Sequence, residues 1–310
     1  MANTTTSKVN GEAIFPPELV TEMFNAVRGH SALARLCTAK PMPFAGVKEM
    51  VFTMDGEAEI VGEGAQKSPN DANFTPVTIV PVKFVYQHRV TDEFKNMSEE
   101  AQLPYLQAFA DGFAKKIARG MDIAAMHGIN PISGAASTVV GTNHFDAVVN
   151  QTATYVAGTS VADDILDTAI QTILGNEREV SGIAMSALFG QYMAAVKVNG
   201  VVQYPEFRFG GKPAAFAGMG VDVNTTVNKK LSAATSRDLA IVGDFANAFR
   251  WGYAKNVPLE IIEYGDPDGQ GDLKRQNQIE LRSEAYIGWG ILDAGSFCRI
   301  VDTVTAGQTS

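Results

Sequence analysis

One long run of alternating residues near the end of the chain limits the folds that this sequence can adopt. Between residues 279 and 291 every second residue is apolar or small, which is typical of a β-strand with one buried face. At about 3.3 Å per residue such a strand is about 40 Å long, over twice the usual length. The members of this phase are Ile279, Leu281, Ser283, Ala285, Ile287, Trp289 and Ile291. The pattern therefore indicates an elongated plate rather than a sphere.

A long helix is predicted over residues 104–127, beginning at Pro104. Its apolar residues recur at three- and four-residue steps, and at 1.5 Å per residue it reaches about 36 Å. Gly112 and Gly120 each cost about 1 kcal/mol relative to alanine inside a helix. We therefore expect another backbone to pack closely against both glycines.

Two further regions are readable from their patterns. Strands at 47–54 and 80–90 flank a polar stretch, 55–74, that is rich in Gly, Glu, Asn and Pro and cannot form core. Together they predict a long hairpin that projects from the body. Over residues 160–250 helices alternate with a strand, which predicts a small α/β or α+β unit whose first helix begins with a capping box at Ser160.

Composition excludes several classes of protein. The 310 residues are 45% hydrophobic and 19% charged, as in a folded chain, and the net charge of -9 disfavours a general nucleic-acid binder. Cys37 and Cys298 are too few for a disulfide framework and lack the spacing of a zinc site. No apolar run approaches the ~20 residues that span a bilayer, which disfavours membrane insertion.

Motifs for nucleotide and hydrolase chemistry fail on inspection. Residues 61–68 end in Lys-Ser like a phosphate loop, but Val61 and Gln66 stand where glycines are needed. Residues 288–293 offer two glycines of a dinucleotide turn, yet Asp293 replaces the third and the segment lies in the long strand. No G-x-S-x-G elbow is present. An α/β enzyme therefore has only generic motifs in its favour.

The histidines show no metal-binding spacing. His30, His88, His127 and His144 are never placed for two ligands on one helix face, so a metal site would require tertiary convergence. We expect solvated or hydrogen-bonded histidines.

A calcium-type loop is a weak candidate at residues 266–277. Asp266, Asp268 and Asp272 hold the first, third and seventh positions, but Asn277 replaces the glutamate at the twelfth and no flanking helices are predicted. The alternative is a polar turn between two strands.

A set of short matches in a fixed order spans nearly the whole chain and resembles the major capsid proteins of tailed bacteriophages, which have the Hong Kong 97-like fold. The order and spacing carry the resemblance. The matching stretches are Phe15–Val20, Glu63–Lys67, Phe113–Gly128, Met185–Gly200, Gly210–Pro213, Val242–Phe245 and Asn277–Arg282, followed by Gly288 and Phe297.

The resemblance implies an α+β fold with four regions. These are an N-terminal arm (1–45), an extended loop (46–90), a peripheral domain with the spine helix and long strands (91–149 and 248–291), and an axial domain (150–247 and 292–310). It also implies the function. Many copies would self-assemble as hexamers and pentamers into an icosahedral shell around a double-stranded DNA genome, held without sequence-specific binding.

The extended loop is the expected interface between copies. A lone two-stranded ribbon is only marginally stable in water, so a neighbouring subunit would have to cover it. The expected contact residues are Glu63, Gly64, Lys67, Asn70, Asp71 and Phe74. The acidic balance fits as well, because strong attraction to DNA would resist packaging.

Further partners follow from the resemblance. Only a dozen or so polar residues precede Ile14, where some relatives carry a built-in scaffold segment, so a separate scaffolding protein is expected. A portal and a decoration protein are further expected partners. The protein would assemble in the host cytoplasm and reside in the virion, with no cofactor, no metal and no membrane.

The resemblance also suggests a self-catalysed covalent cross-link between subunits. In some relatives a lysine of the extended loop attacks an asparagine of another subunit with a glutamate as base, and these positions match Lys67, Asn277 and Glu284. Asn277 and Glu284 are about 23 Å apart on an extended strand, so the site would be built across subunits. The alternative is that Lys67 is a solvated charge, Glu284 an ion-pair partner and Asn277 a loop residue.

Two other functions stay open at this point. A cellular nanocompartment of the encapsulin type would have the same fold but would enclose a cargo enzyme instead of DNA. An α/β enzyme would need a concave pocket with converging titratable groups inside one subunit.

Overall fold

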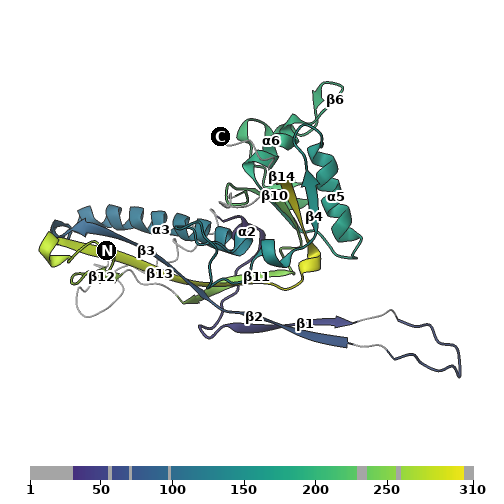
Figure 1. The fold of residues 1–310 in the computed structure, drawn as a ribbon, viewed down its shortest axis with the longest axis horizontal. Coiled ribbons are helices and arrows are strands. Elements are labelled where there is room, and N and C mark those ends of the chain that lie inside the picture. Colours follow the sequence, from purple (N-terminus) through teal and green to yellow (C-terminus); the bar gives the residue numbers. More distant parts are fainter. Residues whose placement is uncertain are drawn as a thin grey trace, which may run out of the picture.

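The chain folds into a long plate, a second unit packed on the plate, and a hairpin that projects away from both (Figure 1). The computed structural model describes residues 31–54, 58–69, 72–96, 99–228, 236–255 and 260–303. Helices and sheets alternate irregularly along it, which confirms the α+β class. The short helices are α2 (Ala32–Leu36), α4 (Phe145–Val148), η1 (Asp92–Asn96), η2 (Pro205–Gly210), η3 (Lys274–Gln276) and η4 (Ala294–Ser296).

The plate is built on β13 (Gln278–Ile291), the long strand that the alternation predicts. β11 (Phe249–Lys255) and β12 (Glu260–Ile262) pair with one of its edges, and β3 (Val82–Thr91) pairs with the other, all antiparallel. Every odd-numbered position of β13 is buried. The apolar side chains at these positions belong to the same hydrophobic cluster as those of α3, as expected for a strand with one face in the core.

Helix α3 (Glu99–His127) lies along the plate (Figure 1). The predicted start at Pro104 is wrong, because the helix already includes Glu99 and Pro104 lies in its second turn. The expected close approach of a backbone at the helix glycines is also wrong. A methyl group on Gly120 would meet the Phe84 ring at 3.3 Å, and one on Gly112 would meet open space.

The second unit is a six-stranded sheet against which α5 (Ala162–Leu174) and α6 (Ala187–Ala195) pack. Its strands, in spatial order, are β4 (Thr152–Tyr155), β14 (Phe297–Thr303), β10 (Ser236–Gly243), β5 (Gly182–Met185), β9 (Met219–Val223) and β8 (Ala215–Phe216). The predicted capping box is wrong: Ser160 accepts a hydrogen bond from the Val156 N–H instead, and Val161 precedes α5. β6 (Lys197–Val198) and β7 (Val201–Val202) form a small separate hairpin.

The projecting hairpin consists of β1 (Val47–Met54) and β2 (Ala72–Ile79), with Val47 opposite Ile79. The first strand agrees with its prediction, and a strand is present over most of 80–90, but the expected pairing of these two strands is wrong. That segment is β3, which pairs with β13. β2 begins at the end of the predicted polar stretch and continues beyond it to Ile79, and Pro76 is tolerated because the strand lies at an edge.

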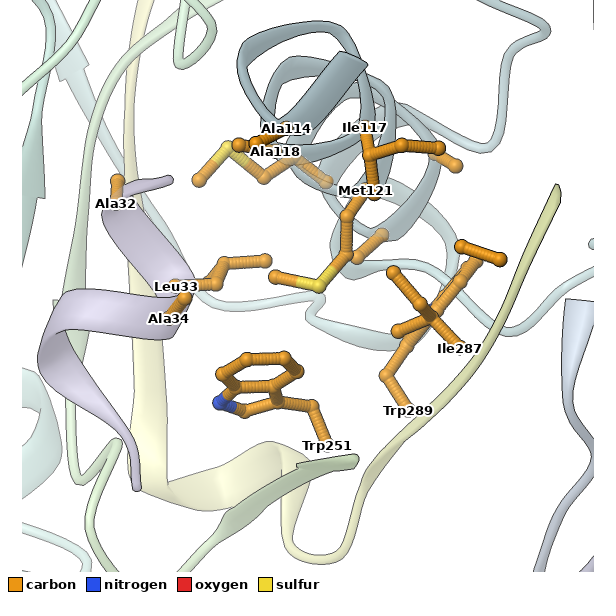
Figure 2. Packing of buried hydrophobic residues seen from close by; sticks show 14 of the residues in the cluster. Ala32, Leu33, Ala34, Ala114, Ile117, Ala118, Met121, Trp251, Ile287 and Trp289 are labelled. Carbon is orange, nitrogen blue, oxygen red and sulfur yellow. The ribbon is translucent and has the colours of Figure 1, made fainter. Parts of the chain in front are cut away.

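A tightly packed core fixes α2 to the plate. Leu33 of α2, Met121 of α3 and Trp251 of β11 are at most 1% exposed and converge on one another (Figure 2). The Trp251 indole N–H donates to the Cys37 carbonyl at 2.8 Å, so the polar atom of this large ring is satisfied inside the core.

We expect Met121→Ala to lower the free energy of unfolding by about 3 kcal/mol, because it removes buried methylenes and leaves a cavity. Urea denaturation of the unassembled chain, followed by tryptophan fluorescence, measures the change. Met50→Ala is the matched control, since Met50 is 59% exposed on β1 and its truncation should change stability by no more than about 0.5 kcal/mol. Equal effects of the two variants would contradict the packing described.

Candidate assembly surfaces and the buried junction

The hairpin carries large apolar side chains that its own chain leaves uncovered. Phe52 and Phe74 face each other across β1 and β2 with ring centroids 4.7 Å apart, and they are 48% and 64% exposed. Met50 lies two residues before Phe52 on the same face. We call Met50, Phe52 and Phe74 the hairpin patch. Exposed apolar patches of this kind mark surfaces that bind other proteins.

The structure places most of the predicted contact residues on this hairpin. Glu63, Gly64 and Lys67 lie exposed in the loop 58–69, and Phe74 lies on β2. The Ser68 N–H donates to the Glu59 carboxylate at 2.9 Å across this loop. Asn70 and Asp71 lie outside the described residues.

The three candidate cross-linking residues occupy separate places in the chain. Asn277 ends η3 in the left-handed conformation and is exposed, whereas Glu284 lies within β13. The Glu284 carboxylate is 2.6 Å from Lys83 Nζ, and the pKa of Lys83 is raised by this hydrogen bond. Glu284 therefore has an ion-pair partner inside its own chain, and Lys67 lies on the distant hairpin loop.

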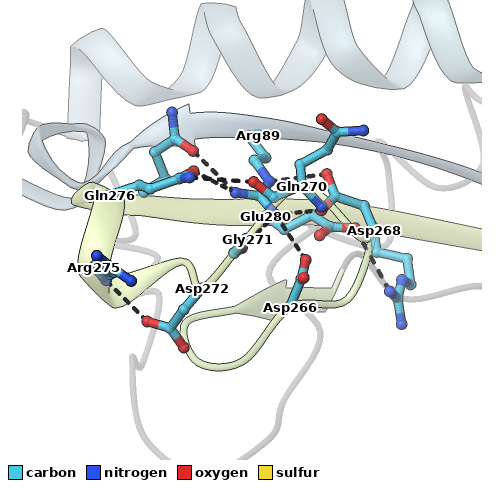
Figure 3. Close-up of polar contacts among 11 residues, drawn as sticks. Arg89, Asp266, Asp268, Gln270, Gly271, Asp272, Arg275, Gln276 and Glu280 are labelled. Carbon is cyan, nitrogen blue, oxygen red and sulfur yellow. Dashed lines mark hydrogen bonds and ion pairs between the residues drawn. The ribbon is translucent and has the colours of Figure 1, made fainter.

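The loop between β12 and β13 is held to the plate by Arg89 of β3 (Figure 3). Its Nε donates to Asp268 at 2.8 Å, and its Nη2 donates to the Gly271 carbonyl at 2.7 Å and lies 3.2 Å from Asp266. Its Nη1 donates to Gln276 at 2.7 Å. The guanidinium also lowers the pKa of Asp268. Arg89 thus uses most of its five donors on one loop.

This arrangement bears directly on the calcium candidate. The oxygens of Asp266 and Asp268 surround a guanidinium, and Asp272 accepts instead from the Arg275 N–H at 2.9 Å. The segment is a polar turn between two strands, the alternative that the sequence left open. Beneath it Glu280, which lies opposite Arg89 on β13, is fully buried, and burial raises the pKa of this carboxyl.

A buried polar junction, which sequence reasoning missed, joins α3 to the second unit. His127 Nδ1 lies 2.9 Å from Asp146 of α4 and 3.8 Å from Asp238 of β10. Arg299 of β14 contacts both carboxylates, at 2.8 and 3.2 Å. His127, Asp146 and Asp238 are close enough to ligate a metal ion, but Arg299 already supplies a cation to both carboxylates. The residues come from four elements, so no local spacing could reveal them.

The same junction continues to helix α2. Asp122 accepts hydrogen bonds from the Ser31 hydroxyl, the Ala32 N–H at 2.9 Å and the Thr226 hydroxyl at 2.9 Å. Burial outweighs these bonds and raises the pKa of Asp122 to about 6. The His127 Nε2–H donates to the Thr226 carbonyl at 3.1 Å, which links the two carboxylate groups.

Electrostatics favour a charged His127. Burial opposes the charged imidazole, but the hydrogen bond and the charge of Asp146 outweigh it and raise the pKa of His127. Burial likewise opposes the Asp146 carboxylate, yet His127, Asp238 and Arg299 lower its pKa. Burial and the neighbouring Asp146 raise the pKa of Asp238 well above its ordinary value.

We expect the stability of the chain to fall as pH rises above about 6.5, the ordinary histidine pKa, through the raised pKa of folded His127. A raised histidine pKa stabilises the fold only while the folded state binds the extra proton. His127→Gln should remove this slope in urea denaturation measured at pH 6, 7 and 8. His144→Gln is the control of opposite sign, because burial lowers the pKa of His144 and its contribution is lost as pH falls. An unchanged slope in His127→Gln would refute the assignment.

None of the helices in the described part of the chain is both long and apolar enough to cross a membrane.

Comparisons with known proteins agree with this architecture. A structure from Mycobacterium phage Ogopogo is 34% identical, with a TM-score of 0.74 over 88% of this chain and 92% of that one. One from Gordonia phage Cozz is 25% identical, with a TM-score of 0.71 over 87% and 85%. The capsid of an empty GTA particle, at 14% identity and a TM-score of 0.61 over 97% and 95%, shares the fold. A comparison with curated proteins found no match.

A family model described as the phage capsid family matches residues 11–302, nearly the whole chain. The match confirms the resemblance that the sequence carries, and the solved structures confirm the expected Hong Kong 97-like fold. This chain therefore belongs to the phage capsid family, as a major capsid protein of the virion.

Proposed function

We propose that copies of this major capsid protein close into an icosahedral shell of hexamers and pentamers around a double-stranded DNA genome. One observation supports this most: the hairpin patch is apolar and exposed, and the hairpin extends away from its own core (Figure 1). A two-stranded ribbon gains stability only when a surface covers it. A neighbouring copy is the surface that a shell provides.

We assign the regions of the chain to roles in that shell. Residues 1–45 act as the arm, and 91–149 with 248–291 as the peripheral domain. Residues 150–247 with 292–310 act as the axial domain. The extended loop begins at residue 46, and we place its end at Ile79, since β3 is a strand of the plate. The two hydrophobic clusters support this division: one contains α3 and β13, and the other α5, α6 and most of the six-stranded sheet.

Rotational symmetry supports the ring arrangement. The GTA capsid, which shares the fold, was computed with C5 symmetry. In any closed ring of identical copies, each copy meets its two neighbours through different surfaces. We propose such head-to-tail contacts here. A separate scaffolding protein, a portal and a decoration protein would complete the particle, and assembly would take place in the host cytoplasm.

The other candidate functions have less support. The hollow on the second unit is lined mainly by apolar side chains and lacks the converging titratable groups of an enzyme site. A nanocompartment shell would share the fold, and packaged DNA in place of a cargo enzyme would distinguish the two.

We expect electron microscopy of the purified protein, alone or co-expressed with candidate scaffolding genes, to show hollow particles. Phe74→Asp should abolish them, because it places a charge on the hairpin patch that a neighbour must cover. Thr75→Asp, the adjacent exposed position whose side chain points to the other face of β2, controls for the loss of strand propensity. Wild-type particle yield for Phe74→Asp would show that the patch is no interface, and a soluble monomer in every condition would end the shell assignment.

The isopeptide stays a hypothesis for Lys67, Asn277 and Glu284. The ion pair between Lys83 and Glu284 weighs against it, because a general base must first lose such a partner. We therefore expect denaturing gels of assembled particles to show only monomers. Ladders that disappear in Lys67→Arg, which keeps the charge but removes the amine, would establish the cross-link instead.

A further inference from the structure

The second unit ends in an aromatic side chain that its own chain leaves in solvent. Phe209, in η2, is 98% exposed, although its neighbour Phe207 is buried. Val198 and Val201 of the small β6–β7 hairpin are 55% and 65% exposed. In Figure 1, β6 lies at the end of the unit remote from the plate. Apolar side chains thus gather at this tip, which we call the axial tip.

The backbone holds Phe209 outward in a fixed conformation. Phe209 has φ +57°, a left-handed conformation that is rare for bulky residues and marks sites held by their surroundings. Phe207 anchors one side of the turn in the core, and the Gly211 N–H donates to the Arg208 carbonyl at 3.0 Å on the other. A methyl group on Gly211 would lie 2.0 Å from the Glu206 carbonyl oxygen, so the turn is tightly closed. The backbone that carries the exposed ring is therefore preorganised, which lowers the entropy lost on binding.

A hollow of about 420 Å³ lies beside the exposed ring. Ala194 and Ala195 at the end of α6 line it together with Phe207 and Phe209. The Arg208 guanidinium lies over the Phe209 ring, 5.1 Å from its centroid. The exposed Phe209 side chain, which we call the knob, does not fill the hollow of its own copy, because it is almost wholly in solvent.

We propose that Phe209 of one copy inserts into the hollow beside Ala195 of the next copy around a rotation axis. The inference rests on the proposed function, because it needs copies arranged in rings. A ring requires two different surfaces that complement each other, and the axial tip presents both within a few residues. Tips that meet near an axis bring the knob of each copy to the hollow of its neighbour. A buried aromatic at the centre of such a contact is typical of the residues that dominate binding.

Two single variants test the contact directly. Phe209→Cys chains and Ala195→Cys chains are mixed, assembled into particles and treated with a short thiol-reactive cross-linker. Burial raises the pKa of the native thiols Cys37 and Cys298 to about 11, which keeps them unreactive. We expect dimers on denaturing gels from the mixed particles and not from particles of either variant alone. Ile132→Cys mixed with Ala195→Cys is the control, since Ile132 is 93% exposed but lies in the loop after α3.

Several results would overturn the proposal. These are the absence of dimers from mixed particles, a dimer band no stronger than in the Ile132 control, and an equal dimer band from Phe209→Cys alone, which would indicate a contact between two knobs.

Phe209→Ala should weaken association between copies about 30-fold, with partial recovery in Phe209→Leu. Normal assembly of Phe209→Ala with loss of a bound foreign protein would assign the hollow to that protein. If the wild-type chain forms no particles, the proposed function fails and this contact with it; particles without the cross-link refute only the contact.

Discussion

Backbone pairing along β13 is the interaction on which the remaining structure depends. Its register with β3 runs without a break from Gln278 opposite Thr91 to Ile287 opposite Val82, and β11 and β12 pair with the other edge. A strand paired on both sides has few free backbone groups and resists bending. Because α3 packs on the buried face of the same strand, helix and sheet form one stiff plate. The hairpin, the second unit and the loop held by Arg89 are all placed by their connections to this plate.

The junction between the plate and the second unit combines apolar packing with a buried polar network. Phe145 of α4 packs against Phe297 of β14 with ring centroids 5.1 Å apart, and the polar groups lie beside this contact. His127 ends α3 and pairs with Asp146 of α4, whereas Asp238 of β10 and Arg299 of β14 belong to the sheet of the second unit. Such a network is costly to open one member at a time, because each removal leaves a buried charge without compensation. The network also requires specific distances and angles between its polar atoms, whereas apolar packing does not. The junction therefore defines how the two units are oriented more sharply than an apolar contact of the same size would.

The periodicity of apolar residues predicted individual strands correctly. It did not predict which strands pair or which distant side chains contact one another. The alternation in β13 and the apolar pattern of β1 each predicted the right strand, because burial of one face leaves a period of two. The strand over 80–90 was also real, but periodicity does not say which strand it pairs with, so its assignment to the hairpin was wrong. Arg89 and Asp268 are 179 residues apart, and the junction around His127 needed four elements to converge. Motifs based on the local spacing of residues cannot identify contacts between residues so far apart in the chain. The turn at Phe209 is likewise invisible in sequence, since a positive φ at phenylalanine has no compositional signal.

The plate and the two exposed surfaces together explain why a shell protein can be both stable and incomplete. The plate and the second unit have their own cores, so a single copy can hold its fold while unassembled. The hairpin patch and the axial tip present exposed apolar side chains, and in the proposed shell these side chains would leave water where copies meet. Association that buries these surfaces stabilises them by mass action, so their order depends on the concentration of copies. Stiffness in the plate keeps the two surfaces at a fixed separation, and this lets contacts at one end of a copy constrain where its neighbour lies at the other.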